Sequence, residues 1–217
     1  MNAVSVTCWV TTVLLALGLS APLAAQELKV RITETLPYVD VMHDGHKVRI
    51  QRVQDTNNKL IDDFAKTSRT CPPFCIHPIK LAGGVETYGE LELLDFLNKQ
   101  VKSGTGLLID SRLPDFYRTE TIPGAINVPF SVVRSDNPHI EKLLTAVGAT
   151  RSAGRWDFAG AKSLLMFCNG LWCDQSPKAI EALLSMGYPA EKMKYYRGGM
   201  QSWRSLGLTT VVPAKPQ

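Results

Sequence analysis

The sequence has few cysteines and no basic run. Its 217 residues include five cysteines, too few for a disulfide scaffold, so a hydrophobic core must stabilise the fold. There are 24 Lys and Arg against 20 Asp and Glu, with no cluster of the kind that binds nucleic acid. This small positive charge suits an anionic small-molecule substrate better than a cationic one.

Charge is also lacking at the amino terminus, where no charged side chain precedes Glu27. The apolar run there, residues 9–19, is too short to span a bilayer and is followed by small residues that end at Ala25. This pattern predicts a signal peptide, residues 1–25, cleaved after Ala25, and hence a periplasmic or secreted protein. The usual leading Lys or Arg is absent, so an uncleaved membrane anchor is the alternative.

Residues 26–85 are expected to form a small β-rich N-terminal extension. In it, "YVDVM" and "KVRI" flank "HDGH". The dipeptide Asp44-Gly45 is typical of the two-residue turn of a β-hairpin. We therefore predict a hairpin there, with His43 and His46 exposed beside its turn.

The extension also contains "CPPFC", residues 71–75, whose adjacent prolines exclude regular structure and favour a rigid loop. With His77, the two cysteines supply only three candidate metal ligands and no second cluster follows, so neither a metal nor another cofactor is expected. A local Cys71–Cys75 disulfide is one interpretation. Free or cross-paired thiols are the other.

From residue 86 onward, short apolar segments alternate with amphipathic ones. This alternation predicts a three-layer α/β domain with a mostly parallel sheet over residues 86–210, followed by a tail, residues 211–217. In such sheets ligands bind at the carboxyl ends of the strands, where Cys168 lies. The expected helices are 89–101, 138–149 with Pro138 in its first turn, 176–188 and 200–207, and the expected strands lie within 106–110, 122–130, 162–168 and 193–199.

Three ordered motifs identify a family. Asp110 and Arg112 follow the first apolar strand, "IPGAINVP" comes next, and Cys168 precedes the closing "GGMQSW". Together they resemble the rhodanese (sulfurtransferase) family. The resemblance covers about residues 86–208 and implies a single rhodanese domain. It further implies that Cys168 takes a sulfur atom from a donor such as thiosulfate and holds it as a persulfide.

The residues around Cys168 favour the same chemistry independently. A nucleophilic sulfur must be a thiolate, and backbone N–H groups and a helix amino terminus lower the pKa of a thiol. Ser176 and Pro177 are expected as the N-cap and first residue of the following helix. The expected substrate-binding loop consists of Asn169, Gly170, Leu171, Trp172, Asp174, Gln175 and Ser176.

A basic residue is missing from this loop, although members of the family that favour thiosulfate commonly have one. The donor anion would then be bound by backbone N–H groups and by Arg112, Lys178 or Arg197. Cysteine phosphatases, which use a related loop, place an arginine six positions after the cysteine. Here that position is Asp174, which excludes a phosphatase.

Cys173 is the second thiol of the loop, five positions after Cys168. It is interpreted either as a resolving or relay cysteine, or as a structural residue paired with Cys71 or Cys75 or simply packed. The resolving interpretation implies a Cys168–Cys173 disulfide in the resting protein.

The predicted function is therefore sulfur transfer. The expected partners are a small-molecule sulfur donor and a thiol, cyanide or sulfur-accepting protein as acceptor, with no nucleic acid. The alternatives are thiol–disulfide redox chemistry at the same loop and a non-catalytic rhodanese-like binding module.

Overall fold

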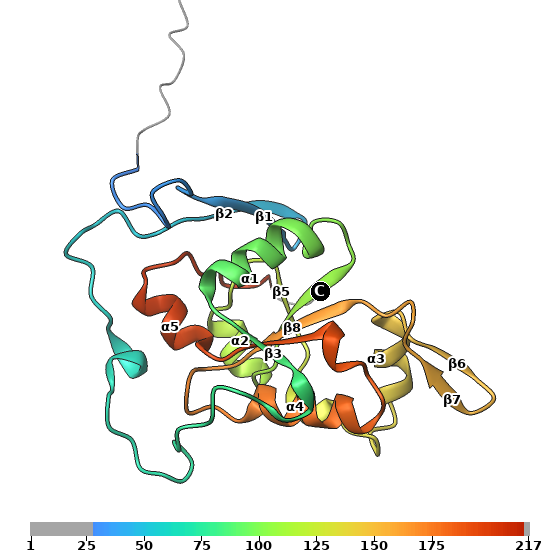
Figure 1. Cartoon of the computed structure of the whole chain (residues 1–217). Helices are drawn as coiled ribbons and strands as arrows, with labels where there is room; N and C mark the ends of the chain where they lie inside the picture. The colour runs from blue at the N-terminus through green and yellow to red at the C-terminus, as the bar shows by residue number, and fades with distance from the viewer. Residues whose placement is uncertain (1–27, 215–217) are drawn as a thin grey trace, which may run out of the picture.

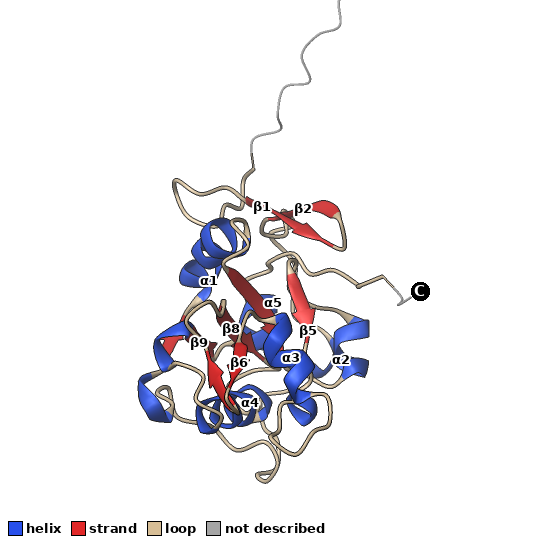
Figure 2. Cartoon of the chain, turned by 90° about the vertical axis from the view of Figure 1, so that its right-hand side faces the viewer, coloured by secondary structure: helices blue, strands red, loops and turns tan. Residues whose placement is uncertain are grey.

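The computed structural model describes residues 28–214, so the predicted signal peptide lies outside the described residues. Among those residues, no helix has the length and hydrophobicity needed to cross a membrane. The chain forms one central sheet with helices on both faces, and a small hairpin stands apart from the central strands (Figure 2).

The central sheet has five strands, all parallel, in the order β3-β9-β8-β4-β5. The predicted α/β class and parallel sheet are thus confirmed. β8 lies in the middle and is apolar along its length, as a strand covered on both faces must be. The strands are β3 (Glu86–Tyr88), β4 (Gly106–Asp110), β5 (Ala125–Asn127), β8 (Ser163–Phe167) and β9 (Met193–Tyr196).

Alternate residues of each strand enter two separate hydrophobic cores, because successive side chains point to opposite faces of a sheet. Leu108 and Leu165 pack with α1 and α5, whereas Ile109 and Leu164 pack with α3 and α4. Figure 1 shows α1 on one side of the strands and α4 on the other. The helices are α1 (Glu90–Phe96), α2 (Pro114–Thr119), α3 (Ile140–Ala146), α4 (Gln175–Ser185) and α5 (Gly199–Ser205).

Short elements complete the domain. α1 continues into a π-helical turn, η3 (Leu97–Val101), which completes the predicted helix 89–101. α3 begins at Ile140 after His139, so Pro138 lies before the helix and not in its first turn. An additional hairpin, β6 (Thr150–Ser152) and β7 (Arg155–Asp157), was not predicted. The 3-10 turns are η1 (Asp62–Ala65), η2 (Ala82–Gly84), η4 (Phe130–Val132) and η5 (Ala190–Lys192).

The predicted hairpin of the extension is present as β1 (Val39–His43) and β2 (His46–Ile50), which pair antiparallel. Asp44 and Gly45 both have positive φ, 48° and 77°, as a type I′ turn requires. The inner side chains of the hairpin, Val39, Val41 and Ile50, belong to the core cluster of α1 and α5.

His43 differs from the prediction because it is 7% exposed. Its Nδ1 accepts a hydrogen bond from the N–H of Gly124, at 3.2 Å. Burial lowers the pKa of His43, and nearby Asp44 only partly offsets that effect. The side chain thus links the hairpin to the "IPGA" turn.

Between β2 and β3 the extension runs down the side of the molecule on which α5 lies (Figure 1). It is joined there to the end of the domain. Val53 N–H donates to Gly207 O at 2.7 Å, and Thr209 N–H donates to Gln51 O at 3.0 Å. These contacts bring residues 60–80 toward the carboxyl end of the sheet.

Candidate active site

Cys168 is the first residue after β8, at the carboxyl end of the central strand. Its side chain is 2% exposed. Asn169 and the rest of the predicted loop lead from it into α4. The thiol therefore lies in the short loop between the end of β8 and the start of α4.

The paired glycines of "GGMQSW" hold this loop from the other side. Gly199 has a φ of 55°, and a Cβ added to it would lie 2.4 Å from Cys168 O and 2.7 Å from Gly170 N. Met200 N–H donates to Cys168 O at 3.0 Å, and Gln201 N–H donates to Asn169 O at 2.9 Å. Only glycine permits this close approach of two backbones.

The polar groups around the Cys168 sulfur act on its pKa in opposite directions. Burial raises the pKa, because it penalises the thiolate. The neighbouring polar groups of Cys173, Ser176 and Asn169 stabilise the thiolate and outweigh burial, so the pKa lies below its ordinary value of 9.0. One contact favours the protonated form, since the thiol also donates to Cys173 O at 3.3 Å. The net effect favours a thiolate on Cys168.

The two thiols of the loop are both free. Cys173 is 4% exposed, and burial together with the hydrogen bond to Cys168 raises its pKa. The opposite directions of the two pKa shifts favour Cys168 over Cys173 as the thiolate of the pair. The resting Cys168–Cys173 disulfide of the resolving interpretation is not present in this structure, nor is a Cys173 bridge to Cys71 or Cys75.

Ser176 does not cap α4, contrary to the prediction. The helix begins at Gln175 with Asp174 as N-cap, and Pro177 lies within its first turn. Ser176 is fully buried, and its hydroxyl has no hydrogen-bond partner among the described residues. The residue that resembles a cap in the sequence instead faces the thiol.

Arg112 is not available to bind an anion, which corrects its predicted role. It is 1% exposed, and Asp110 is fully buried. Its Nε and Nη2 donate to the Asp110 carboxylate at 2.9 and 2.7 Å, and its Nη1 donates to Asn169 Oδ1 at 3.4 Å. A buried ion pair of this kind costs about 3–5 kcal/mol when one partner is removed. Arg112 thus positions the residue after Cys168.

Lys178 and Arg197, the other predicted anion-binding residues, are also engaged. Lys178 forms an ion pair with Asp174 at 2.6 Å on the surface of α4. Arg197 donates through Nε, at 3.1 Å, and through Nη2 to the carbonyl oxygen of His77. Arg197 therefore attaches the extension to the domain.

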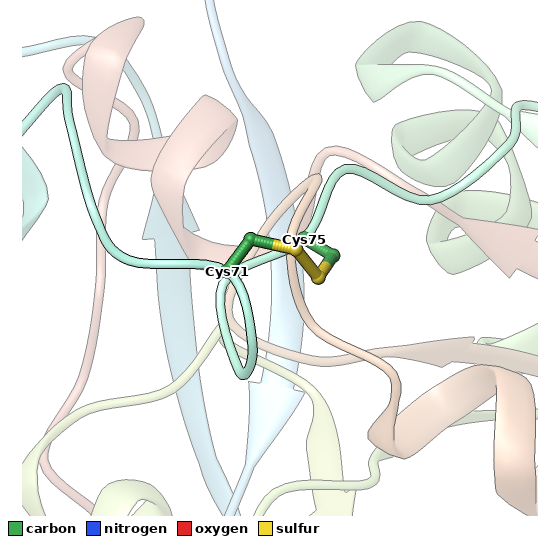
Figure 3. Close-up of a disulfide and its surroundings, with 2 residues drawn as sticks. All are labelled: Cys71 and Cys75. Carbon is green, nitrogen blue, oxygen red and sulfur yellow. A yellow bond between two sulfur atoms is a disulfide. The ribbon is translucent and has the colours of Figure 1, made fainter.

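The extension covers the active loop. His77 N–H donates to Leu171 O at 3.0 Å, and the ring of Phe74 meets the edge of Trp172 with centroids 4.9 Å apart. In the same segment of the extension, Cys71 and Cys75 form a disulfide (Figure 3) with Cα atoms 4.7 Å apart. The bridge closes the proline turn that presents Phe74 to the loop.

A cavity of about 520 Å³ lies between the extension and the domain. It reaches the active loop at Asn169, the residue that follows Cys168, and at Trp172. Phe64 and Phe74 of the extension and Phe116 of α2 form apolar walls. Within the described part of the chain, His, Cys, Asp and Glu form no group of three able to hold a metal ion.

The comparisons with known proteins agree with these features. Residues 93–206, more than half of the chain, match the model of the rhodanese-like domain. The chain belongs to the rhodanese-like family. No curated protein matches this rhodanese-like chain.

Several solved structures are similar to this rhodanese-like chain. A rhodanese with anions from E. coli is 27% identical, with 49% of this chain and 96% of that chain covered and a TM-score of 0.33. A human single-domain sulfurtransferase is 25% identical, with 56% and 96% covered and a TM-score of 0.37. A rhodanese-related protein from Thermoplasma volcanium is 21% identical, with 58% and 98% covered and a TM-score of 0.40.

Of the predicted site residues, Asn169, Cys173 and Ser176 lie beside the Cys168 thiol. Gly170 lies against Gly199, Leu171 contacts the extension, and Trp172 lines the cavity. Gln175 begins α4. Sequence reasoning missed Arg69, Phe74 and Phe116, which come from the extension and from α2. The apolar and basic side chains around "CPPFC" were the only signal for the first two.

Proposed function

We propose that this protein is a sulfurtransferase in which Cys168 carries sulfane sulfur as a persulfide. One observation supports this most strongly. The Cys168 thiol lies at the carboxyl end of β8 among hydrogen-bond donors that lower its pKa although it is buried. A low pKa supplies the thiolate that nucleophilic attack on a sulfur donor requires.

The proposed reaction has two steps. The Cys168 thiolate attacks the outer sulfur of thiosulfate, a new S–S bond forms, and sulfite leaves with the electron pair of the old S–S bond. An acceptor thiolate or cyanide then attacks the outer sulfur of the persulfide and regenerates the Cys168 thiolate. No oxidant or reductant is consumed, because each step forms and breaks one bond to the transferred sulfur.

The surrounding groups have distinct parts in this scheme. Asn169 N–H and the Ser176 N–H and hydroxyl stabilise negative charge on the sulfur. Cys173 donates a further hydrogen bond as a protonated thiol. Asp110 and Arg112 position Asn169 from behind. We also propose the exported location expected from residues 1–25, where a donor and acceptor would be met outside the cytoplasm.

Thiol–disulfide exchange is a second candidate function. It is favoured by the closeness of the two residues, since Cys168 Sγ lies 3.3 Å from Cys173 O and neighbouring thiols need little movement to form a bridge. In this case Cys168 would attack a disulfide of the substrate, and Cys173 would resolve the mixed disulfide.

Mass spectrometry separates the two functions. The purified protein is exposed to thiosulfate, and Cys168 is expected to gain about 32 Da, the mass of one sulfur atom, while Cys168→Ser gains nothing because an alkoxide is a poor sulfur nucleophile. Cys173→Ser is the control and should still load sulfur. Sulfur loading at the normal rate in Cys168→Ser would refute the proposal, and reduction of a disulfide substrate without any adduct would favour exchange.

A further inference from the structure

Tyr195 lies on the strand next to that of Cys168 and faces the same side of the sheet. It belongs to β9 and is paired with Met166 of β8, and both side chains are part of the core cluster on the α4 side. Side chains two positions apart along a strand point to the same face, so Cys168, two residues after Met166, is directed to that side as well. The contact of its sulfur with Cys173 O, just before α4, agrees with this direction.

The Tyr195 hydroxyl is buried without a partner. The residue is 0% exposed, and its hydroxyl has no hydrogen-bond partner among the residues that the structure describes. The other two buried tyrosines of the described chain differ in this respect. The Tyr188 hydroxyl donates to Lys162 O at 2.5 Å, and the Tyr196 hydroxyl donates to Glu90 Oε1 at 2.9 Å. A buried donor left unpaired destabilises the protein, so the Tyr195 hydroxyl calls for an acceptor that arrives during function.

The electrostatic environment of Tyr195 indicates where that acceptor would lie. Burial raises the pKa of Tyr195, negative charge at Cys168 and at Cys173 raises it further, and Arg197 offsets part of the effect. In Tyr188 burial alone raises the pKa. Tyr195 therefore stays protonated, as a hydrogen-bond donor, beside the two thiols.

Two further hydroxyls without partners lie at the same end of the sheet. Ser111 and Ser176 are both fully buried, and neither hydroxyl has a hydrogen-bond partner within the described part of the chain. Ser111 follows β4, and its N–H donates to Phe167 O, the residue before Cys168, at 2.9 Å. Ser176 comes from the first turn of α4, a helix that packs on β8 and β9. Three elements thus bring unused donors to the surroundings of Cys168, as a group bound to its sulfur and carrying negative charge would require.

We propose that Tyr195 is a catalytic residue whose hydroxyl donates a hydrogen bond to the outer sulfur of the Cys168 persulfide. This inference rests on the function proposed above. An S–S bond is about 2.05 Å long, so loading extends the Cys168 side chain by that length toward donors that the free thiol does not engage. The thiolate and thiosulfate give the persulfide anion and sulfite, and the negative charge of Cys168 moves from Sγ to the outer sulfur. The hydrogen bond would form only in the loaded protein, so it favours loading and leaves the free thiol unchanged.

The test uses Tyr195→Phe, which removes the hydroxyl and keeps the ring. The full chain is equilibrated with mixtures of thiosulfate and sulfite, and mass spectrometry measures the fraction of Cys168 that carries sulfur. The equilibrium constant for loading should fall about tenfold or more, because a hydrogen bond to a charged group is lost. The rate at which iodoacetamide alkylates the free Cys168 should equal that of the wild-type protein, which also shows that the variant is folded.

Tyr196→Phe and Tyr188→Phe are the matched controls. Each removes a buried hydroxyl, but the partners of these hydroxyls are Glu90 and Lys162, and Tyr196 faces the other hydrophobic core. Both variants should load sulfur with the wild-type equilibrium constant. An unchanged constant in Tyr195→Phe would overturn the inference, and so would an equal loss in the two controls, since any buried hydroxyl would then have the same effect.

A second donor separates this inference from the proposed function. The equilibrium is measured again with glutathione persulfide and glutathione, and Tyr195→Phe should lose the same factor, because the hydrogen bond belongs to the loaded protein and not to the donor. If thiosulfate loads Cys168 no faster than it loads free cysteine, but the equilibrium with glutathione persulfide still depends on Tyr195, the proposed function fails and the role of Tyr195 stands. If neither donor loads Cys168, both are overturned.

Discussion

Two pairs of cysteines lie on either side of the contact between the extension and the active loop. One pair forms a disulfide and the other does not. Cys71 and Cys75 are four positions apart in the extension and form a disulfide. Cys168 and Cys173 are five positions apart in the active loop and are free and buried. The sequence separation of two cysteines therefore does not determine whether they form a disulfide.

The environment of each pair accounts for the difference. Around Cys71 and Cys75 the chain is exposed, and the two prolines between them restrict the backbone to a tight turn. Around Cys168, neighbouring polar groups lower the pKa of the thiol, and the start of α5 packs against the other side of the loop. The first pair closes a turn of the extension. In the proposed function, the second pair provides the nucleophile and a neighbouring thiol that stabilises it.

Peptide mapping of the non-reduced protein gives the largest expected effect, because the outcome is all or none. We expect a Cys71–Cys75 bridge in essentially every molecule. Cys168 and Cys173 should both be alkylated once the protein is unfolded in the presence of the alkylating agent. The measurement is mass spectrometry of the digested protein. A Cys168–Cys173 bridge in the resting protein would make the two pairs alike and would restore Cys173 as a resolving residue.

Substitution of Cys173 tests whether its thiol really acts as a donor. The rate of sulfur loading should rise with pH as Cys168 ionises, with a midpoint below its ordinary value of 9.0 because the pKa is lowered. In Cys173→Ala one donor to the thiolate is lost, so the pKa must rise. We expect the midpoint to move upward by about one pH unit, since a hydrogen bond to a charged group contributes about 1.5 kcal/mol or more.

The matched control is Cys173→Ser, which keeps a donor of similar size. Its midpoint should stay closer to that of the wild-type protein, and stopped-flow loading assays across the pH range would show the difference. An unchanged midpoint in Cys173→Ala would mean that Ser176 and Asn169 alone set the pKa of Cys168. Cys173 would then be a packed residue and no part of the chemistry.

The sequence was sufficient to predict the fold and the position of Cys168. The continuous apolar run of β8 predicts a central strand, and the cysteine after it must then lie at the edge where ligands bind. Asp44-Gly45 likewise predicts the hairpin from local turn chemistry alone. Each of these features is determined by a short segment of sequence, so that segment alone is enough to predict it.

Other features depend on tertiary contacts and could not be predicted in this way. Ser176 resembles an N-cap, but α4 begins at Gln175 with Asp174 as its N-cap. Arg112 resembles an anion-binding residue until its Nε and Nη2 are seen to donate to Asp110. Arg69 lies in a segment without regular secondary structure, where no periodicity indicates its neighbours.

The smallest expected effect concerns the disulfide of the extension. In Cys71→Ser with Cys75→Ser the proline turn is no longer closed, and the chain-entropy account of so short a loop gives a loss of about 2 kcal/mol in the stability of that turn. The central cores should be nearly unaffected, because Cys71 is exposed and Cys75 belongs to neither hydrophobic cluster. Thermal unfolding of the domain should therefore shift little, while hydrogen exchange should accelerate at Phe74 and His77, whose N–H groups bond Thr70 O and Leu171 O.

The same double substitution should affect binding more than chemistry. Arg69 and Phe74 would have to be ordered when the donor binds, and ordering of such side chains costs roughly 0.5–1.5 kcal/mol each. We expect KM for the sulfur donor to rise at least about fivefold, with kcat unchanged, because the turn does not contribute any group that touches the Cys168 sulfur. Steady-state kinetics would measure both. A fall in kcat with KM unchanged would instead mean that the disulfide affects the reactivity of Cys168. The two cysteine pairs would then not have separate roles.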